Sequence, residues 1–159
     1  MTTHRHTYRS ILSWTGTTAG GYEAYDRAHR VAAPPSSNGL ELSADPAFLG
    51  APERLNPEQL LVAAASSCQL LSFLAVAARA RLDVVVYGDD ASAVMPEDDP
   101  PMRITRIDLR PDITLADTGQ PRPNDERLAH LSEVAHRQCF IANSLRSEIM
   151  VSPTFHWAD

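Results

Sequence analysis

The chain has 159 residues, a length that fits a single domain, and 43% of them are hydrophobic, enough for a buried core. The formal net charge is -6 and no run of basic residues stands out, so neither nucleic acid nor an anionic membrane is an expected partner. Residues 1–14 contain no long apolar stretch, so we expect no signal peptide and a cytoplasmic protein. In such reducing surroundings the two cysteines are expected to be free or redox-active thiols.

The first third of the chain predicts short strands joined by turns. Residues 7–14 read as a strand, and the sequence GTTAGG that follows predicts a turn. Residues 22–32 alternate with the period of a strand, although a helix is a competing interpretation. A further short strand is predicted at 40–42, before a loop over 43–55 that contains two prolines.

A long helix is predicted to begin at Pro57. Asn56 is a good N-cap residue, proline suits the first helical position, and Gln59 completes a capping box. Apolar residues then recur at helical spacing, with Cys68 among them, and the flanking positions are nearly as apolar. We expect a central helix of the core, not a membrane span, whose buried stripe contains Leu60, Leu61, Ala64, Cys68, Leu71, Leu74 and Ala75.

The second half of the chain predicts strands over 82–95 and 102–115, a helix over 125–138 and a closing strand over 145–151. Asn124 is the expected cap of that helix. Its apolar stripe consists of Leu128, Leu131, Val134 and Ala135. Because helices and strands do not alternate strictly, the order favours an α+β fold, formed by one domain over 1–159.

Cys68 and Cys139 have two interpretations. Free cysteine is often a small buried hydrophobic residue. Two thiols can also reduce a peroxide, since one thiolate attacks the O–O bond and becomes a sulfenic acid, which the second thiol converts to a disulfide. The attacking thiol then needs a nearby cation to lower its pKa. Arg27 is a candidate for that cation, and Glu58 is a candidate for the carboxylate that holds the arginine.

The sequence NPEQLLVAAASSC, with YEAYDRAH before it and AHRQCFIANS after it, resembles the OsmC/Ohr (osmotically induced protein C-like) family of organic hydroperoxide reductases. Glu58 in the helix start, Cys68 ten residues later and Cys139 after AHRQ match the family pattern. The resemblance implies an α+β fold in which an antiparallel sheet wraps around long central helices in an intertwined homodimer. It also implies a thiol peroxidase with Cys68 as the peroxidatic and Cys139 as the resolving cysteine, assisted by Arg27 and Glu58.

The resemblance implies an organic hydroperoxide as substrate, a dithiol reductant of lipoyl or thioredoxin type, and neither a cofactor nor a metal. Apolar surroundings should favour bulky or lipid-like peroxides over hydrogen peroxide. Arg30 is the competitor of Arg27, but on a strand the two point to opposite faces, and YDRAH favours Arg27. Glu58 and Cys68 lie about 15 Å apart along one helix. Unless that helix is bent, a shared site needs Glu58 from the partner subunit, which is the arrangement that we predict.

Two residues depart from the family pattern, and two other functions compete with the peroxidase. Gln69 stands where an aromatic residue or histidine often follows the first cysteine, and Phe140 where proline often follows the second. A non-catalytic protein of the same fold could instead bind a small hydrophobic ligand in a cleft at the dimer interface. A zinc site is the other alternative, although the chain lacks a Cys-x-x-Cys pair; its ligands would be His29, Cys68, His136 and Cys139.

Overall fold

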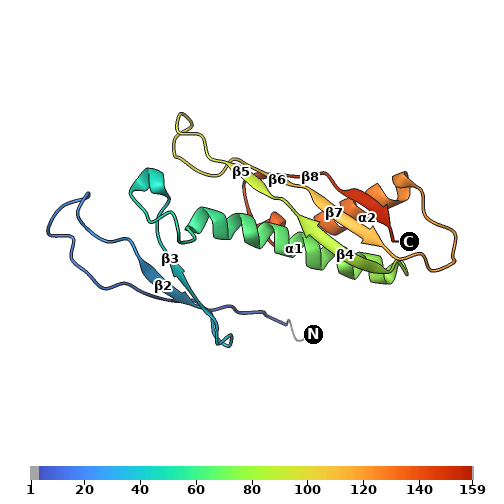
Figure 1. Ribbon diagram of the computed structural model, residues 1–159, viewed down its shortest axis with the longest axis horizontal. Coiled ribbons are helices and arrows are strands. Elements are labelled where there is room, and N and C mark those ends of the chain that lie inside the picture. The colour runs from blue at the N-terminus through green and yellow to red at the C-terminus, as the bar shows by residue number, and fades with distance from the viewer. Residues whose placement is uncertain (1–3, 159) are drawn as a thin grey trace. The chain divides into compact units, whose positions relative to one another are not determined.

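The computed structural model describes residues 4–158. The chain forms two compact units, which meet in sequence between Leu60 and Leu61. Figure 1 labels both helices and most of the strands.

The first unit contains a three-stranded antiparallel sheet. Its strands are β1 (Ile11–Ser13), β2 (His29–Ala32) and β3 (Gly39–Leu42), in the order β1-β2-β3. The predictions of strands within 7–14 and at 40–42 are therefore confirmed. The single domain over 1–159 stays a prediction.

The predicted strand over 22–32 is wrong in its first part, where the chain turns before β2 begins. Gly21 has a φ of +87°, a conformation that L-residues other than glycine rarely adopt. The indole N–H of Trp14 donates to the carbonyl oxygen of Asp26 at 2.8 Å, which occupies a backbone group that a sheet would need. Alternation alone cannot reveal this competition for backbone hydrogen bonds.

The loop over 43–55 is held against the end of β3. The amide of Ser43 donates to the carbonyl oxygen of Leu55 at 2.9 Å, and the Ser43 hydroxyl accepts from the amide of Ala51 at 3.1 Å. A side chain at Gly50 would collide with the carbonyl oxygen of Ala44, so the loop can close here only with glycine. The loop also contains the 3-10 helix η1 (Pro46–Phe48).

Helix α1 (Pro57–Arg79) begins where the sequence predicts. The Asn56 side chain accepts from the amide of Gln59 at 2.8 Å, and the Gln59 side chain accepts from the amide of Asn56 at 3.0 Å. This reciprocal pair satisfies two amides that a helix start otherwise leaves without a partner. The predicted capping box is confirmed.

The buried face of α1 is not the predicted one. The residues buried within the chain are Ala65, Gln69, Phe73, Val76 and Ala77. Leu71 and Leu74, which the predicted stripe contains, are 64% and 37% exposed. Because the helix is apolar on most sides, periodicity identifies a helix but cannot select the side that meets the sheet.

The second unit contains two three-stranded sheets. One has the order β4-β7-β9, formed by β4 (Val84–Asp89), β7 (Pro111–Leu115) and β9 (Thr154–Trp157). The other has the order β5-β6-β8, formed by β5 (Ser92–Val94), β6 (Arg106–Leu109) and β8 (Glu148–Val151).

The α+β class is confirmed, but the two sheets of the second unit are mixed. Strand β4 pairs antiparallel with β7, and β5 with β6, whereas β6–β8 and β7–β9 are parallel pairs. The predicted strands over 82–95 and 102–115 each divide into two, and the predicted closing strand corresponds to β8. Strand β9 was not predicted.

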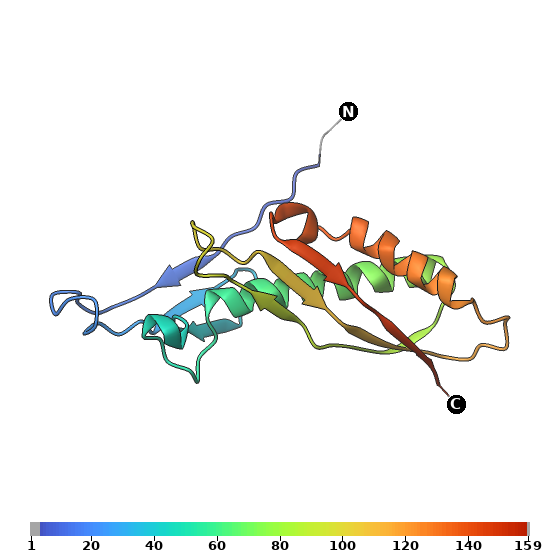
Figure 2. The ribbon, with the colours of Figure 1, turned by 90° about the horizontal axis from the view of Figure 1, so that it is seen from above.

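Helix α2 (Asp125–Arg137) is capped by Asn124, as predicted, and Figures 1 and 2 show it on the same side of the strands as α1. Its Leu128, Leu131 and Ala135 are buried, and Val134 packs beside them, so its predicted stripe is confirmed. The core that they form also contains Phe73, Val76 and Ala77 of α1 with Ile113 and Leu115 of β7. A second core cluster, Ala65 with Ile107 and Leu109, lies where α1 meets β6.

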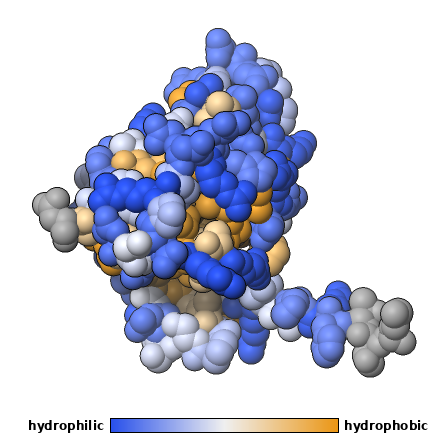
Figure 3. Space-filling view, turned by 90° about the vertical axis from the view of Figure 1, so that its right-hand side faces the viewer, coloured by the Kyte–Doolittle hydropathy of each residue, from blue (hydrophilic) through white to orange (hydrophobic). Residues whose placement is uncertain are grey.

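Helix α1 is apolar on its exposed side as well. Its exposed residues include Ala63, Leu71, Leu74, Ala75 and Ala78. By length and composition it is long and apolar enough to cross a membrane, a test that core helices of soluble proteins also pass, and part of it is buried in the chain. In the view of Figure 3, hydrophobic residues are exposed between hydrophilic ones.

Candidate functional site

The two cysteines lie together in the second unit. Cys68 is in the middle of α1 and Cys139 follows the end of α2, and both are free thiols. The amide of Ile141 donates to the sulfur of Cys68 at 3.4 Å, and the amide of Ala142 donates to the sulfur of Cys139 at 3.4 Å. Two successive amides of one tight segment thus contact the two sulfur atoms, which makes the thiols neighbours.

The surroundings of the two thiols differ. Cys139 is only 1% exposed, and burial, assisted by a hydrogen bond with the Cys68 thiol, raises its pKa to about 11. At neutral pH it is therefore a protonated thiol. Cys68 is half-buried and lines an open pocket of about 450 Å³. Of the two cysteines, only Cys68 combines a pocket in front of its sulfur with access from solvent.

The pocket in front of Cys68 combines apolar and cationic side chains. It runs along one face of α1 and is bordered by the end of α2 and the segment after it, where Phe140 is 80% exposed. Its lining consists of Cys68, Leu71, Ser72, Ala75, Arg79, Arg137, Gln138, Phe140 and Asn143.

Gln69 follows Cys68 but points into the core. It is 1% exposed, and neither atom of its amide has a hydrogen-bond partner among the described residues. The buried hydroxyl of Tyr87 also lacks a partner there, and burial, with the nearby charge of Asp89, raises its pKa. Gln69 therefore changes the polarity of the core behind the thiols and does not line the pocket in front of Cys68.

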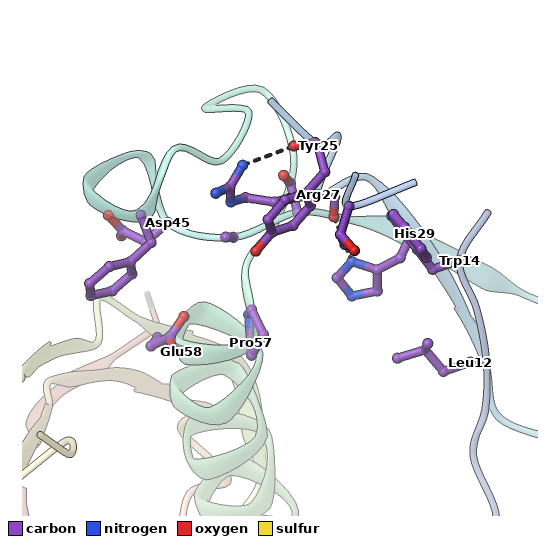
Figure 4. Close-up of a pocket in the computed structure, with 12 residues that line it drawn as sticks. Leu12, Trp14, Tyr25, Arg27, His29, Asp45, Pro57 and Glu58 are labelled. Atoms are coloured by element: carbon purple, nitrogen blue, oxygen red, sulfur yellow. Dashed lines mark hydrogen bonds between the residues drawn. The ribbon is translucent and has the colours of Figure 1, made fainter. Parts of the chain in front are cut away.

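Arg27 and Glu58 line one pocket of about 460 Å³ in the first unit (Figure 4). Arg27 lies just before β2, and Glu58 lies in the first turn of α1. The pocket's other lining residues are mostly apolar or aromatic and include Leu12, Trp14, Tyr25, His29, Phe48 and Pro57. Within the described part of the chain, no hydrogen bond or ion pair joins Arg27 to Glu58.

The Arg27 guanidinium is held by the turn that precedes β2. It donates to the carbonyl oxygens of Tyr25 at 2.9 Å and Tyr22 at 2.6 Å. Its central carbon lies 4.1 Å from the centroid of the Tyr25 ring and 4.7 Å from that of Tyr22, which is cation–π geometry. Arg30 instead pairs with Glu41 on the sheet at 3.0 Å and does not line the pocket. The placement of the two side chains therefore favours Arg27.

The four predicted site residues thus form two pairs, Cys68 with Cys139 and Arg27 with Glu58. The sequence analysis did not identify Tyr22 and Tyr25, which hold Arg27, although both closely precede it in YEAYDR. It also missed the two amides that contact the sulfur atoms, for which side-chain identity gives no signal.

The structure gives the zinc alternative no support. Among residues 4–158, no group of three or more histidine, cysteine, aspartate or glutamate side chains lies close enough together to hold a metal ion. His29 lines the pocket with Arg27 in the first unit.

The chain is similar to proteins of known structure over nearly its whole length. An OsmC-like protein of unknown function from Vibrio cholerae is 28% identical, with a TM-score of 0.84 and coverage of 94% of this chain and 100% of that one. An organic hydroperoxide resistance protein from Elizabethkingia anophelis is 20% identical, with a TM-score of 0.69 and coverage of 98% and 99%. Another from Legionella pneumophila is 18% identical, with a TM-score of 0.68 and coverage of 96% and 99%.

At these identities the two hydroperoxide resistance proteins show a shared fold. No curated protein matches the chain. The sequence model described as OsmC-like protein matches residues 50–154, which is more than half of the chain and contains Glu58 and both cysteines. The chain therefore belongs to the OsmC-like protein family.

Proposed function

We propose that this protein is a cytoplasmic, homodimeric thiol peroxidase that reduces organic hydroperoxides to alcohols. The observation that carries the proposal is the pair of neighbouring free thiols, of which one opens to a pocket and the other is buried. Membership of the OsmC-like family supports it, since some structural relatives are named organic hydroperoxide resistance proteins.

In the first step the Cys68 thiolate attacks the terminal oxygen of the hydroperoxide. The O–O bond breaks, the sulfur becomes a sulfenic acid, and the alkoxide takes up a proton and leaves as the alcohol. The amide of Ile141, which donates to this sulfur at 3.4 Å, stabilises the thiolate. Arg27 would add positive charge that stabilises the thiolate and the transition state, and Glu58 would orient it.

In the second step Cys139 resolves the sulfenic acid. Its thiol attacks the Cys68 sulfur, loses its proton, and releases water as the disulfide forms. The raised pKa of Cys139 keeps it protonated at neutral pH, so that Cys139 does not itself attack the peroxide. A dithiol reductant of lipoyl or thioredoxin type then restores both thiols by exchange and is itself oxidised to a disulfide.

The site is proposed to be shared between two subunits. Helix α1 runs unbroken from Pro57 to Arg79, so Glu58 and Cys68 stay about 15 Å apart along its axis. A glutamate side chain cannot span that distance. Arg27 and Glu58 of one subunit would therefore serve the thiols of its partner.

The exposed apolar side of α1 supports a dimer. An apolar surface of this kind on a single chain is typical of a subunit interface. Burying Leu71 and Leu74 against a second copy of the helix would remove apolar surface from water and stabilise the assembly.

The test is mass spectrometry of the reduced protein after treatment with one equivalent of cumene hydroperoxide. The variants Cys68→Ser and Cys139→Ser are treated and measured in the same way. We expect a Cys68–Cys139 disulfide in the wild type and a Cys68 sulfenic acid in Cys139→Ser. Unchanged thiols would reject the peroxidase. The alternative, a protein that binds a hydrophobic ligand without turnover, would then be tested by ligand binding to the apolar pocket around Trp14.

A further inference from the structure

The second unit contains another cavity, which shares none of its described lining residues with the pocket in front of Cys68. Its volume is about 630 Å³, which suits a small molecule. Its walls are residues 80–83, which directly follow α1, residues of the segment 116–131, and Trp157 of β9. Figure 1 shows the end of α1, the loop before α2 and the C-terminus at one end of this unit. Leu71 and Leu74, which are proposed to pack against a second copy of the chain, do not line it.

Three arginines from separate segments line this cavity. Arg81 follows α1, Arg122 lies in the loop before α2, and Arg127 lies in the first turn of α2. Asp83 is the one acidic side chain among the lining residues in the described part of the chain, and the two acidic residues that precede Arg127 in its turn do not line the cavity. Within residues 4–158, the guanidinium groups of Arg81 and Arg127 form neither a hydrogen bond nor an ion pair. The cavity is therefore locally cationic, although the chain has a net charge of -6.

Arg122 is held in one orientation by its neighbours. Its Nε and Nη2 donate to the Asp117 carboxylate at 3.2 and 2.7 Å, and the amide of Gly119 donates to the same carboxylate at 2.9 Å. The guanidinium carbon lies 4.8 Å from the centroid of the Trp157 ring, which is cation–π geometry. Among the described residues Nη1 has no hydrogen-bond partner, so this nitrogen is left to donate to a ligand.

Arg81 occupies a backbone position that usually belongs to glycine. Its φ is +60°, its amide donates to the carbonyl oxygen of Ala78 at 3.1 Å, and the amide of Leu82 donates to that of Ala77 at 2.9 Å. This is the left-handed turn that commonly ends helices, and a side chain is disfavoured there. Because glycine would end α1 with less strain, the arginine indicates a role for its side chain.

The chemistry of the lining selects a phosphate group joined to an organic body. A carboxylate is satisfied by the fork of one guanidinium, whereas a phosphate has three oxygens to share among several arginines and about -1.5 to -2 charges at neutral pH. The remaining lining residues are mostly apolar and include Leu82, Leu131 and Trp157. An organic group placed against them would be removed from water.

We propose that this cavity binds a small organic phosphate, whose phosphate group is bound by Arg81, Arg122 and Arg127. The apolar lining residues contact its organic part. The bound phosphate links the end of α1 to the start of α2, since the arginines come from both. The site is separate from the two thiols, so the inference does not depend on the proposed peroxidase function.

The test is a titration of isotope-labelled protein with phenyl phosphate, followed by NMR of the indole N–H groups. Trp157 lines this cavity and Trp14 lines the pocket of the first unit, so the two signals report the two places separately, and Trp14→Phe assigns them. The Trp157 signal should shift to saturation with a Kd of about 1 mM or below. Benzoate, which replaces the phosphate by a carboxylate, should bind at least about tenfold more weakly. An unchanged Trp157 signal, or equal affinity for benzoate, would overturn the proposal.

The arginine variants test the assignment of the site. Arg81→Gly and Arg127→Gln should each weaken the binding of phenyl phosphate about tenfold or more. Arg103→Gln is the matched control and should bind as the wild type does, since Arg103 is an exposed arginine that pairs with Asp99 and does not line the cavity. Unchanged affinity in both cavity variants, or the same loss in the control, would show that the probe does not bind through these arginines.

Arg81→Gly also separates lost binding from lost folding. Glycine suits the positive φ at this position, so the Tm of this variant without ligand should be close to that of the wild type. Phenyl phosphate should raise the Tm of the wild type and of Arg103→Gln, because it binds only the folded protein. It should leave the Tm of the double variant Arg81→Gly/Arg127→Gln unchanged. An equal rise in the double variant would reject the site.

Discussion

Ile141 donates its backbone N–H to the sulfur of Cys68 at 3.4 Å, across 73 residues of sequence. This contact ties the segment after α2 to the middle of α1, and the next amide in that segment contacts Cys139. The segment thus brings a buried thiol and an accessible thiol together.

The thiols should differ strongly in their reactivity toward iodoacetamide. With a pKa of about 11 against an ordinary 9.0, Cys139 has about a hundredfold less thiolate at neutral pH than an unperturbed cysteine. Burial lowers its reactivity further. In native Cys68→Ser, burial still raises the pKa of Cys139 and shields its sulfur, so Cys139 should be alkylated much more slowly than in the same variant unfolded in urea. Rapid native labelling would show that Cys139 is open to solvent.

The raised pKa of Cys139 also predicts how stability depends on pH. In the unfolded chain this thiol ionises near 9.0, but in the folded chain it ionises near 11. Its contribution is therefore complete below the lower pKa and is lost as the pH rises through the higher one. The free energy of unfolding of the reduced protein should fall by about 2 kcal/mol more in the wild type than in Cys139→Ala across this window. Urea denaturation at several alkaline pH values measures the difference, and parallel curves would contradict the prediction.

Gln69→Leu should stabilise the protein. Both amide atoms of Gln69 lack a partner among the described residues while the side chain is 1% exposed, and an unsatisfied buried polar group costs about 1–3 kcal/mol. Leucine has a similar volume and would continue the apolar face between Ala65 and Phe73. Urea denaturation should show a gain of about 1 kcal/mol or more, whereas Gln120→Leu, on an exposed loop, should change stability by less than about 0.5 kcal/mol. A loss of stability in Gln69→Leu would mean that the amide is satisfied in the assembled protein.

Much of the fold could be predicted because its signals are local. The capping box at Asn56 and the apolar stripe of α2 depend on neighbouring residues, and both are confirmed. The failures lie where a tertiary choice decides. The side of α1 that meets the sheet, the turn over 22–28 and strand β9 all depend on partners far away in sequence, so no periodicity could select them.

The candidate site was predictable only as a set of residues. Cys68, Cys139, Arg27 and Glu58 could be named from a resemblance in sequence, but their grouping into two pairs, one in each unit, comes from the structure. The pocket in front of Cys68 was not foreseen, because it joins α1 to the end of α2 and Arg79 has no special sequence signal.

Mixed dimers should show whether the site is shared. Arg27→Gln should lower kcat/KM about a hundredfold or more, since it removes a charge that acts in the transition state, and Cys68→Ser should be inactive. If Arg27 of one subunit serves Cys68 of its partner, a dimer of one Arg27→Gln chain and one Cys68→Ser chain contains one intact site. Subunits unfolded together and refolded at equal concentrations should then recover roughly a quarter of the wild-type rate, because half of the dimers are mixed and each has one of two sites.

The control for this experiment places both changes in one chain. Wild type refolded with Arg27→Gln/Cys68→Ser holds the same number of each substitution, but every mixed dimer then has one subunit free of changes. For a shared site, such a dimer has a thiol without its arginine and an arginine without its thiol, so it should be nearly inactive. Wild-type homodimers, a quarter of all dimers, still leave this mixture at roughly a quarter of the wild-type rate, so for a shared site the two mixtures should be about equally active. For a site within one chain the single variants would fail to complement, whereas the double variant mixed with wild type should keep roughly half of the wild-type rate. The comparison therefore decides the shared arrangement even when refolding is incomplete, because both mixtures pass through the same treatment.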